Sequence, residues 1–147
     1  MESLRQWLEP DYVNLADMLV AFNEHVCNYL QVERPYLRSS QIEYDAGARR
    51  SQRLFNLLQA LHSERYYATS GAVAYMLEDK VFPRPDMEVL FQNFCPRPYP
   101  QISSPSFVPY LSALDALFNV SPYTFLTDTA RGTSQWASWE QATQQFR

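Results

Sequence analysis

Residues 49–62 read RRSQRLFNLLQALH, the clearest structural signal in the sequence. The leucines at positions 54, 57, 58 and 61 recur at three- and four-residue spacing, while the arginines and Asn56 fall mostly between them. An α-helix turns once every 3.6 residues, so this spacing gathers the leucines on one face. The stretch therefore predicts an amphipathic helix over residues 49–62 that packs against a core.

Similar signals lie on both sides of this stretch. Asp11 is suited to cap a helix over residues 11–31, whose apolar positions also recur every three or four residues. Ser40 and Glu43 fit a capping box that starts a short helix over residues 40–46. Ser63 is suited to cap a helix over residues 64–80, and a brief helix is expected over residues 86–94. The first 95 residues thus predict a compact bundle of five to six helices.

The remainder of the chain differs in composition. Of ten prolines, eight lie between Pro83 and Pro122. Residues 95–100 contain three alternating prolines, which predict an extended, irregular segment. Two further helices are expected over residues 110–118 and 134–146. Because no convincing run alternates apolar and polar residues, we predict an all-α fold, in which residues 96–147 pack on the bundle of residues 1–95 without forming an independent domain.

The segments Tyr36–Glu43 and Arg49–Leu61 together resemble the middle of a caspase recruitment domain, a member of the death-fold superfamily. The resemblance covers residues 11–94, and a helical bundle of other ancestry is the alternative. It implies a non-enzymatic protein interaction domain in apoptotic or innate-immune signalling, or a viral modulator of that signalling. A different class of function is a self-assembling structural or scaffold subunit, of which a viral subunit is one variant.

Charge and composition exclude several other functions. A net charge of −4 and a pI near 5.1 argue against nonspecific nucleic-acid binding. The sequence contains no run of 18 apolar residues, so no membrane span is predicted. The first residues lack the layout of a signal peptide. We therefore expect a cytoplasmic protein that has no membrane partner, without excluding the nucleus. Only three glycines are present, too few for phosphate-binding glycine loops.

No catalytic, cofactor or metal site is predicted. His25 and Cys27 diverge by about 200° on the expected helix, so they form no nucleophile–base pair. The two cysteines and two histidines lack zinc-ligand spacing, and the cysteines are expected to be free thiols. Enzymatic activity is therefore not expected.

Charge and aromatic content indicate candidate residues for binding a protein partner. For a domain that resembles a caspase recruitment domain, the partner can be a second copy of the chain. Three arginines lie in one sector of the helix over residues 49–62, and a solvated helix face is the alternative interpretation. Aromatic residues make up 15% of the chain, and some of its tyrosines, such as Tyr99 and Tyr110, are expected to mark a contact surface. The predicted partner-binding residues are Arg38, Arg49, Arg50, Arg53, Trp136 and Trp139.

Overall fold

The computed structural model describes residues 11–102, 106–130 and 135–146, which form an α/β fold. Its sheet has the strand order β1-β2-β3, with β1 at Arg65–Thr69, β2 at Glu88–Gln92 and β3 at Trp136–Ser138. Strand β1 is parallel to β2, with Ala68 beside Phe91, and β3 is antiparallel to β2. The predicted all-α fold is therefore wrong.

Each strand lies within a stretch that the sequence predicts to be helical. In β2, Val89 and Phe91 are buried at 3% and 1% exposure. Glu88, the first residue of the strand, is exposed. Residues two apart point to the same side of a strand but diverge by about 200° on a helix. A helix over residues 86–94 would thus have placed Val89 and Phe91 on opposite sides, whereas the strand buries both in one core.

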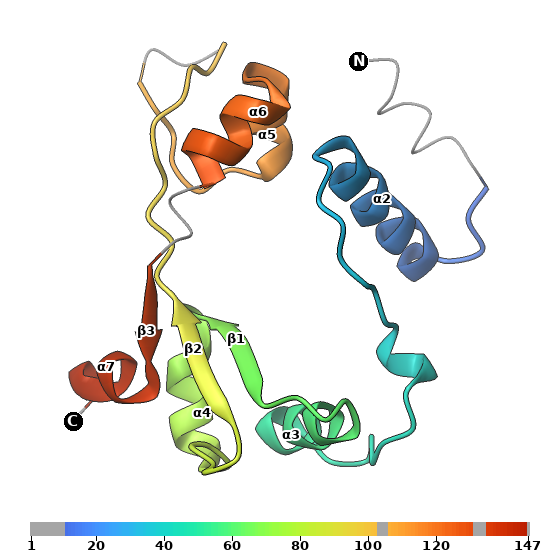
Figure 1. Cartoon of the computed structure of the whole chain (residues 1–147), viewed down its shortest axis with the longest axis vertical. Coiled ribbons are helices and arrows are strands. Elements are labelled where there is room, and N and C mark those ends of the chain that lie inside the picture. The colour runs from blue at the N-terminus through green and yellow to red at the C-terminus, as the bar shows by residue number, and fades with distance from the viewer. Residues whose placement is uncertain (1–10, 103–105, 131–134, 147) are drawn as a thin grey trace.

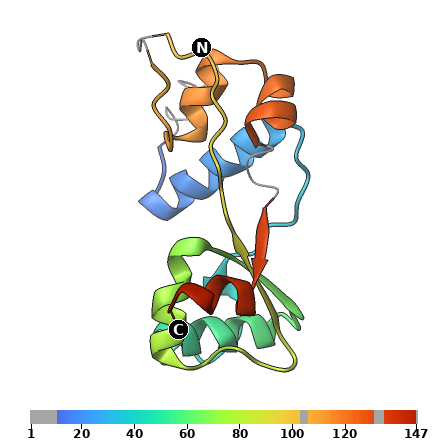
Figure 2. The ribbon, with the colours of Figure 1, turned by 90° about the vertical axis from the view of Figure 1, so that its left-hand side faces the viewer.

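Three helices pack on one face of the sheet, as Figures 1 and 2 show: α3 (Arg50–Ala60), α4 (Val73–Asp79) and α7 (Trp139–Thr143). The core lies between these helices and the strands. The rings of Phe55 and Phe82 meet edge to face there, with centroids 5.9 Å apart, and Met76 is fully buried. The opposite face of the sheet carries two exposed aromatic residues, Tyr67 and Trp136.

Four predicted helices change in length or type. The helix expected over residues 40–46 is a single 3₁₀ turn, η1 (Ser39–Gln41). The helix expected over residues 64–80 divides into β1, a 3₁₀ turn η2 (Ser70–Ala72) and α4. The segment 86–94 holds β2, and the helix expected over residues 134–146 divides into β3, α7 and a 3₁₀ turn η5 (Gln144–Phe146), with Ser134 itself outside the described residues. Aromatic and β-branched residues favour strands when a neighbouring strand can pair with them, and that information is not local.

The first described helix, α2 (Leu15–Tyr29), begins slightly later than predicted. Its N-cap is Asn14, whose side-chain oxygen accepts a hydrogen bond of 2.9 Å from the backbone N–H of Asp17, rather than Asp11. No residue of α2 is buried. None of the helices in the described ranges is long and apolar enough to cross a membrane.

Beyond β2, the chain runs away from the sheet to a second group of short helices (Figure 1). These are α5 (Ala113–Asn119), α6 (Pro122–Thr124) and a π-helical turn, η3 (Phe125–Thr129). Residues 93–100, which include the alternating prolines, form neither helix nor strand. The chain then returns to the sheet as β3, so the sheet joins residues on both sides of the predicted division at residue 95.

Asp79 fastens the end of α4 to the start of α3. Its Oδ2 accepts hydrogen bonds from the hydroxyl of Ser51, at 2.7 Å, and from the backbone N–H of Ser51, at 3.1 Å. Its Oδ1 lies 3.2 Å from Nε of Arg50. The Ser51 hydroxyl is the main cause that lowers the pKa of Asp79, opposed by partial burial and reinforced by the positive charge of Arg50.

We expect Phe91→Ala to destabilise the protein by about 3–5 kcal/mol, because it leaves a cavity at the centre of the core. Phe118→Ala is the matched control, since Phe118 is 50% exposed and its ring stays partly in water. Urea unfolding followed by circular dichroism gives both values. Equal losses for the two variants would contradict the burial of Phe91 in the core.

We expect the stabilising effect of Asp79 to depend on pH. Because its pKa is lower in the folded chain than its ordinary value of 3.8, its contribution is fully present above about pH 5 and is lost as the pH falls through the folded pKa. The wild type should therefore be more stable than Asp79→Asn at neutral pH, and the difference should shrink below pH 3.8. Thermal unfolding at several pH values measures it. A difference that stays constant into acid would show that the Asp79 carboxylate does not hold the two helices.

Candidate ligand-binding cavity

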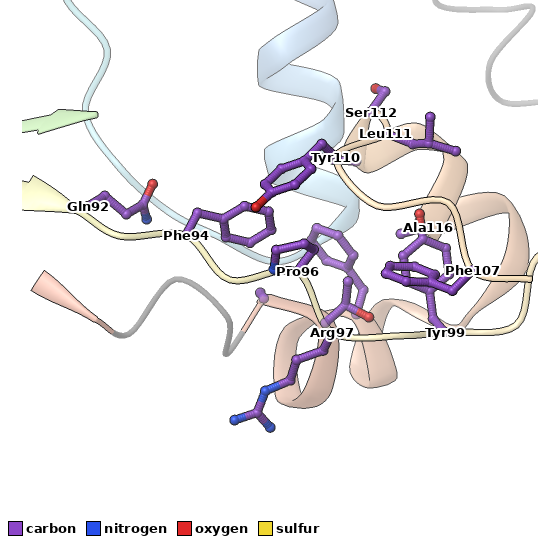
Figure 3. Close-up of a pocket in the computed structure, with 14 residues that line it drawn as sticks. Gln92, Phe94, Pro96, Arg97, Tyr99, Phe107, Tyr110, Leu111, Ser112 and Ala116 are labelled. Carbon is purple, nitrogen blue, oxygen red and sulfur yellow. The ribbon is translucent and has the colours of Figure 1, made fainter. Parts of the chain in front are cut away.

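A cavity of about 290 Å³ lies between the segment that follows β2 and the helices α5 and η3 (Figure 3). One wall comes from residues 92–99, a second from residues 107–112, and the rest from Ala113 and Ala116 of α5 and from residues 125–130. The alternating prolines keep the first wall extended, because each fixes its own φ and disfavours helix at the residue before it. The lining is mostly apolar and aromatic, and we call this site the aromatic cavity.

Two pairs of aromatic rings shape the cavity. Phe94 and Tyr110 meet edge to face with centroids 6.2 Å apart, and Tyr99 and Phe107 do so at 5.3 Å. Figure 3 shows Phe94 and Tyr110 side by side at one end and Tyr99 with Phe107 at the other. Edge-to-face contacts of this kind add roughly 0.5–1.5 kcal/mol to the effect of burial, so the rings support each other.

Asp115, on α5, holds the extended segment in place. Its Oδ2 accepts hydrogen bonds from the hydroxyl of Tyr99, at 2.7 Å, and from Nε2 of Gln101, at 3.1 Å. The Gln101 side chain also accepts from the backbone N–H of Val108, at 2.8 Å, and donates to the carbonyl of Val108, at 3.1 Å. These bonds connect both extended walls to α5. A network of hydrogen bonds therefore holds the cavity walls together behind their apolar surface.

Neither the hydroxyl of Tyr99 nor the guanidinium of Arg97 is directed at the interior of the cavity. Burial is the main cause that raises the pKa of Tyr99, and its hydrogen bond to Asp115 raises it further, so its hydroxyl stays protonated at neutral pH. Its proton is donated to Asp115 rather than presented to the cavity. The side chain of Arg97 leads away from the rings in Figure 3, so its guanidinium does not face them.

Tyr110 has an unusual backbone for a residue with a side chain. Its φ of 61° lies in the left-handed region, which costs about 1 kcal/mol or more for residues other than glycine. Tyr110 is nonetheless 72% exposed, so burial of its ring does not explain the conformation. The conformation places the ring against Phe94 at the cavity.

The predicted arginine cluster lies elsewhere, on α3 and before η1. Arg50 pairs with Glu78 at 2.8 Å and with Asp79, Arg38 pairs with Asp17, and Nε of Arg53 donates to the hydroxyl of Tyr44 at 3.3 Å. Arg49 is exposed at the N-cap of α3. Three of the four arginines therefore make contacts within the chain, and a role of the cluster in binding a partner stays a prediction.

The two predicted tryptophans have different environments. Trp139 is 9% exposed and packs in the core, with its ring 5.8 Å from that of Phe91. Trp136 is 42% exposed and meets the ring of Tyr67 at 4.9 Å on the open face of the sheet. Neither lines the aromatic cavity.

None of the six predicted residues lines the cavity, although part of its signal was visible in the sequence. Tyr99 and Tyr110 were expected to mark a contact surface, and both line it. The interleaving of aromatic residues with prolines over residues 94–110 is the pattern that could have located it. The decisive link, the contact of Asp115 with Tyr99 and Gln101, joins positions 14 and 16 residues apart and has no local signature.

The described residues contain no group of three or more His, Cys, Asp or Glu side chains placed to hold a metal ion. Cys27 and Cys95 are both free thiols, as expected.

Comparison with known proteins contradicts the predicted resemblance to a caspase recruitment domain. The model of the WbqC-like protein family matches residues 1–125, a span that includes most of the cavity. No curated protein and no solved structure matches the chain.

The death-fold resemblance is therefore wrong, because short leucine-rich helices led by arginines occur in many folds. The same match contradicts the predicted function in apoptotic or innate-immune signalling and its alternative, a self-assembling structural or scaffold subunit, viral or not. From its family match over residues 1–125, this chain belongs to the WbqC-like protein family.

Proposed function

We propose that the chain binds a small, uncharged molecule that carries an apolar ring, and that it binds this molecule in the aromatic cavity without transforming it. The observation that carries the proposal is the cavity of about 290 Å³ whose aromatic walls are held by hydrogen bonds around Asp115. Cavities near this size, mostly apolar with a few polar groups, are typical of small-molecule sites.

The rigidity of the walls favours binding. The Gln101 side chain and Asp115 fix both extended segments before any ligand arrives. A site that is already ordered loses less conformational entropy on binding, so more of the contact energy appears as affinity. The backbone conformation of Tyr110 places its ring against Phe94, so this end of the cavity is also formed before a ligand arrives.

The chemistry of the lining favours an uncharged ligand and no catalysis. The titratable side chains that line the cavity are Arg97, Tyr99 and Tyr110. The hydroxyl of Tyr99 is committed to Asp115, and the guanidinium of Arg97 is turned away from the rings. General acid–base catalysis needs a group that can reach the substrate with its proton. Of these three side chains, Arg97 and Tyr99 are not placed for it, and only Tyr110 remains.

We expect Ala113→Trp to block the cavity, because Ala113 lines it, is exposed and tolerates a larger side chain without disturbing the core. p-Cresol and cyclohexanol serve as aromatic and aliphatic ring probes, titrated into the labelled chain and followed by NMR. At least one probe should give saturable shifts at Leu111 and Ala116, and Ala113→Trp should weaken its affinity tenfold or more, about 1.4 kcal/mol.

The control is Ala74→Trp, an equal substitution at an exposed position of α4 far from the cavity in sequence. It should bind the probes as the wild type does. If neither probe shifts the cavity signals, or if Ala113→Trp binds them unchanged, the proposed function is wrong.

We expect Tyr99→Phe to loosen the cavity while keeping the ring. It removes one hydrogen bond to Asp115, which should lower the free energy of unfolding by about 0.5–1.5 kcal/mol, and it should also weaken probe binding. Tyr123→Phe is the control, because Tyr123 is 77% exposed. Denaturant unfolding and the same NMR titration measure the two effects. Unchanged stability in Tyr99→Phe would mean that the Asp115 network does not hold the walls.

A further inference from the structure

A second cavity, of about 350 Å³, lies at the carboxyl ends of the parallel strands. Ser70 follows directly after β1, and Asn93 follows directly after β2. Parallel strands end at the same edge of a sheet, and the arrowheads of β1 and β2 in Figure 1 point the same way. In open α/β sheets, ligands bind in the crevice beyond these carboxyl ends.

The third wall of this cavity comes from the far end of the chain. β3 brings Ala137 beside Phe91, and α7 and the following turn contribute Gln141, Ala142 and Gln144. The backbone N–H of Asn93 donates to the carbonyl of Gln135 at 2.9 Å, which holds the end of β2 against the segment that leads into β3. The cavity is therefore assembled from three separate parts of the sequence.

The lining is rich in amide side chains and has no charge. Its nine described residues are Ser70, Val73, Phe91, Gln92, Asn93, Ala137, Gln141, Ala142 and Gln144, none of which is ionisable. Phe91 and Val73 give it an apolar floor, since both are almost fully buried. A carboxylate or phosphate ligand would need a cationic partner, and a cationic ligand would need a carboxylate, so neither kind of charge is matched here.

Several of the polar groups are available for a ligand. Within the described part of the chain, the side chains of Ser70, Asn93 and Gln144 make no hydrogen bond. Oε1 of Gln141 accepts from the backbone N–H of Ser138 at 2.8 Å, which leaves its Nε2 as a donor. Each amide group offers donors beside an acceptor, the arrangement that pairs with a neighbouring donor and acceptor on a neutral ligand.

We infer that this amide-lined cavity is a second binding site, which takes a neutral ligand of about the size of a monosaccharide or a nucleobase through adjacent donor and acceptor groups. The site is distinct from the aromatic cavity. The one described residue that lines both is Gln92.

The test uses the full chain, labelled so that side-chain amide signals are visible by NMR. Methyl α-glucoside and adenosine are the neutral probes, and sodium acetate and methylammonium chloride are the charged probes. At least one neutral probe should give saturable shifts of the Asn93 and Gln144 side-chain amides, and the charged probes should give none at equal concentration. Binding of the glucoside alone assigns a sugar, adenosine alone assigns a base, and both together support the shared chemistry.

Asn93→Ala and Gln144→Ala should each weaken the affinity about threefold to tenfold, the effect of one neutral hydrogen bond. Gln59→Ala is the matched control, because Gln59 is exposed on α3 and lies outside the cavity. Ala113→Trp should leave this binding unchanged, which separates the site from the aromatic cavity.

Each of the following results would overturn the inference. They are the absence of saturable shifts with both neutral probes, equal binding of a charged probe, and Asn93→Ala and Gln144→Ala variants that bind as Gln59→Ala does. Loss of binding in Ala113→Trp would also overturn it, since the probe would then occupy the aromatic cavity.

Discussion

Strand β2 is the constraint on which the rest of the structure depends. It pairs with β1 on one side and β3 on the other, and it buries Val89 and Phe91 against the helices. The extended chain that leaves its carboxyl end forms a wall of the aromatic cavity, while the end itself borders the amide-lined cavity. One strand thus fixes the core and the positions of both candidate sites.

The two cavities differ in chemistry because they are built from different materials. Two walls of the aromatic cavity are chain without regular structure, which side-chain hydrogen bonds hold to α5, and prolines keep the first of these walls extended. The amide-lined cavity is made by the ends of regular elements, where polar side chains border the apolar floor of Phe91 and Val73. Preformed walls in the first and uncommitted amides in the second suit ligands of different polarity.

Sequence patterns alone placed the fold in the wrong class, because they missed all three strands of the sheet. The helix over residues 49–62 was predicted nearly at its observed bounds, because its leucines recur at helical spacing over about two turns and this signal needs no distant partner. The strands were missed because each has five residues or fewer, too short for alternation to stand out from helical spacing.

The sequence by itself determined the long amphipathic helices, the extended proline-rich segment and the absence of zinc-ligand spacing, since all of these depend on residues close together in the chain. Only the tertiary structure decided that residues 65–69 and 88–92 are strands, that Trp139 is a core residue, and that Asp115 joins Tyr99 and Gln101. The physical reason is that strand pairing, burial and cavity walls arise from contacts between distant residues, and short segments take the conformation that those contacts stabilise.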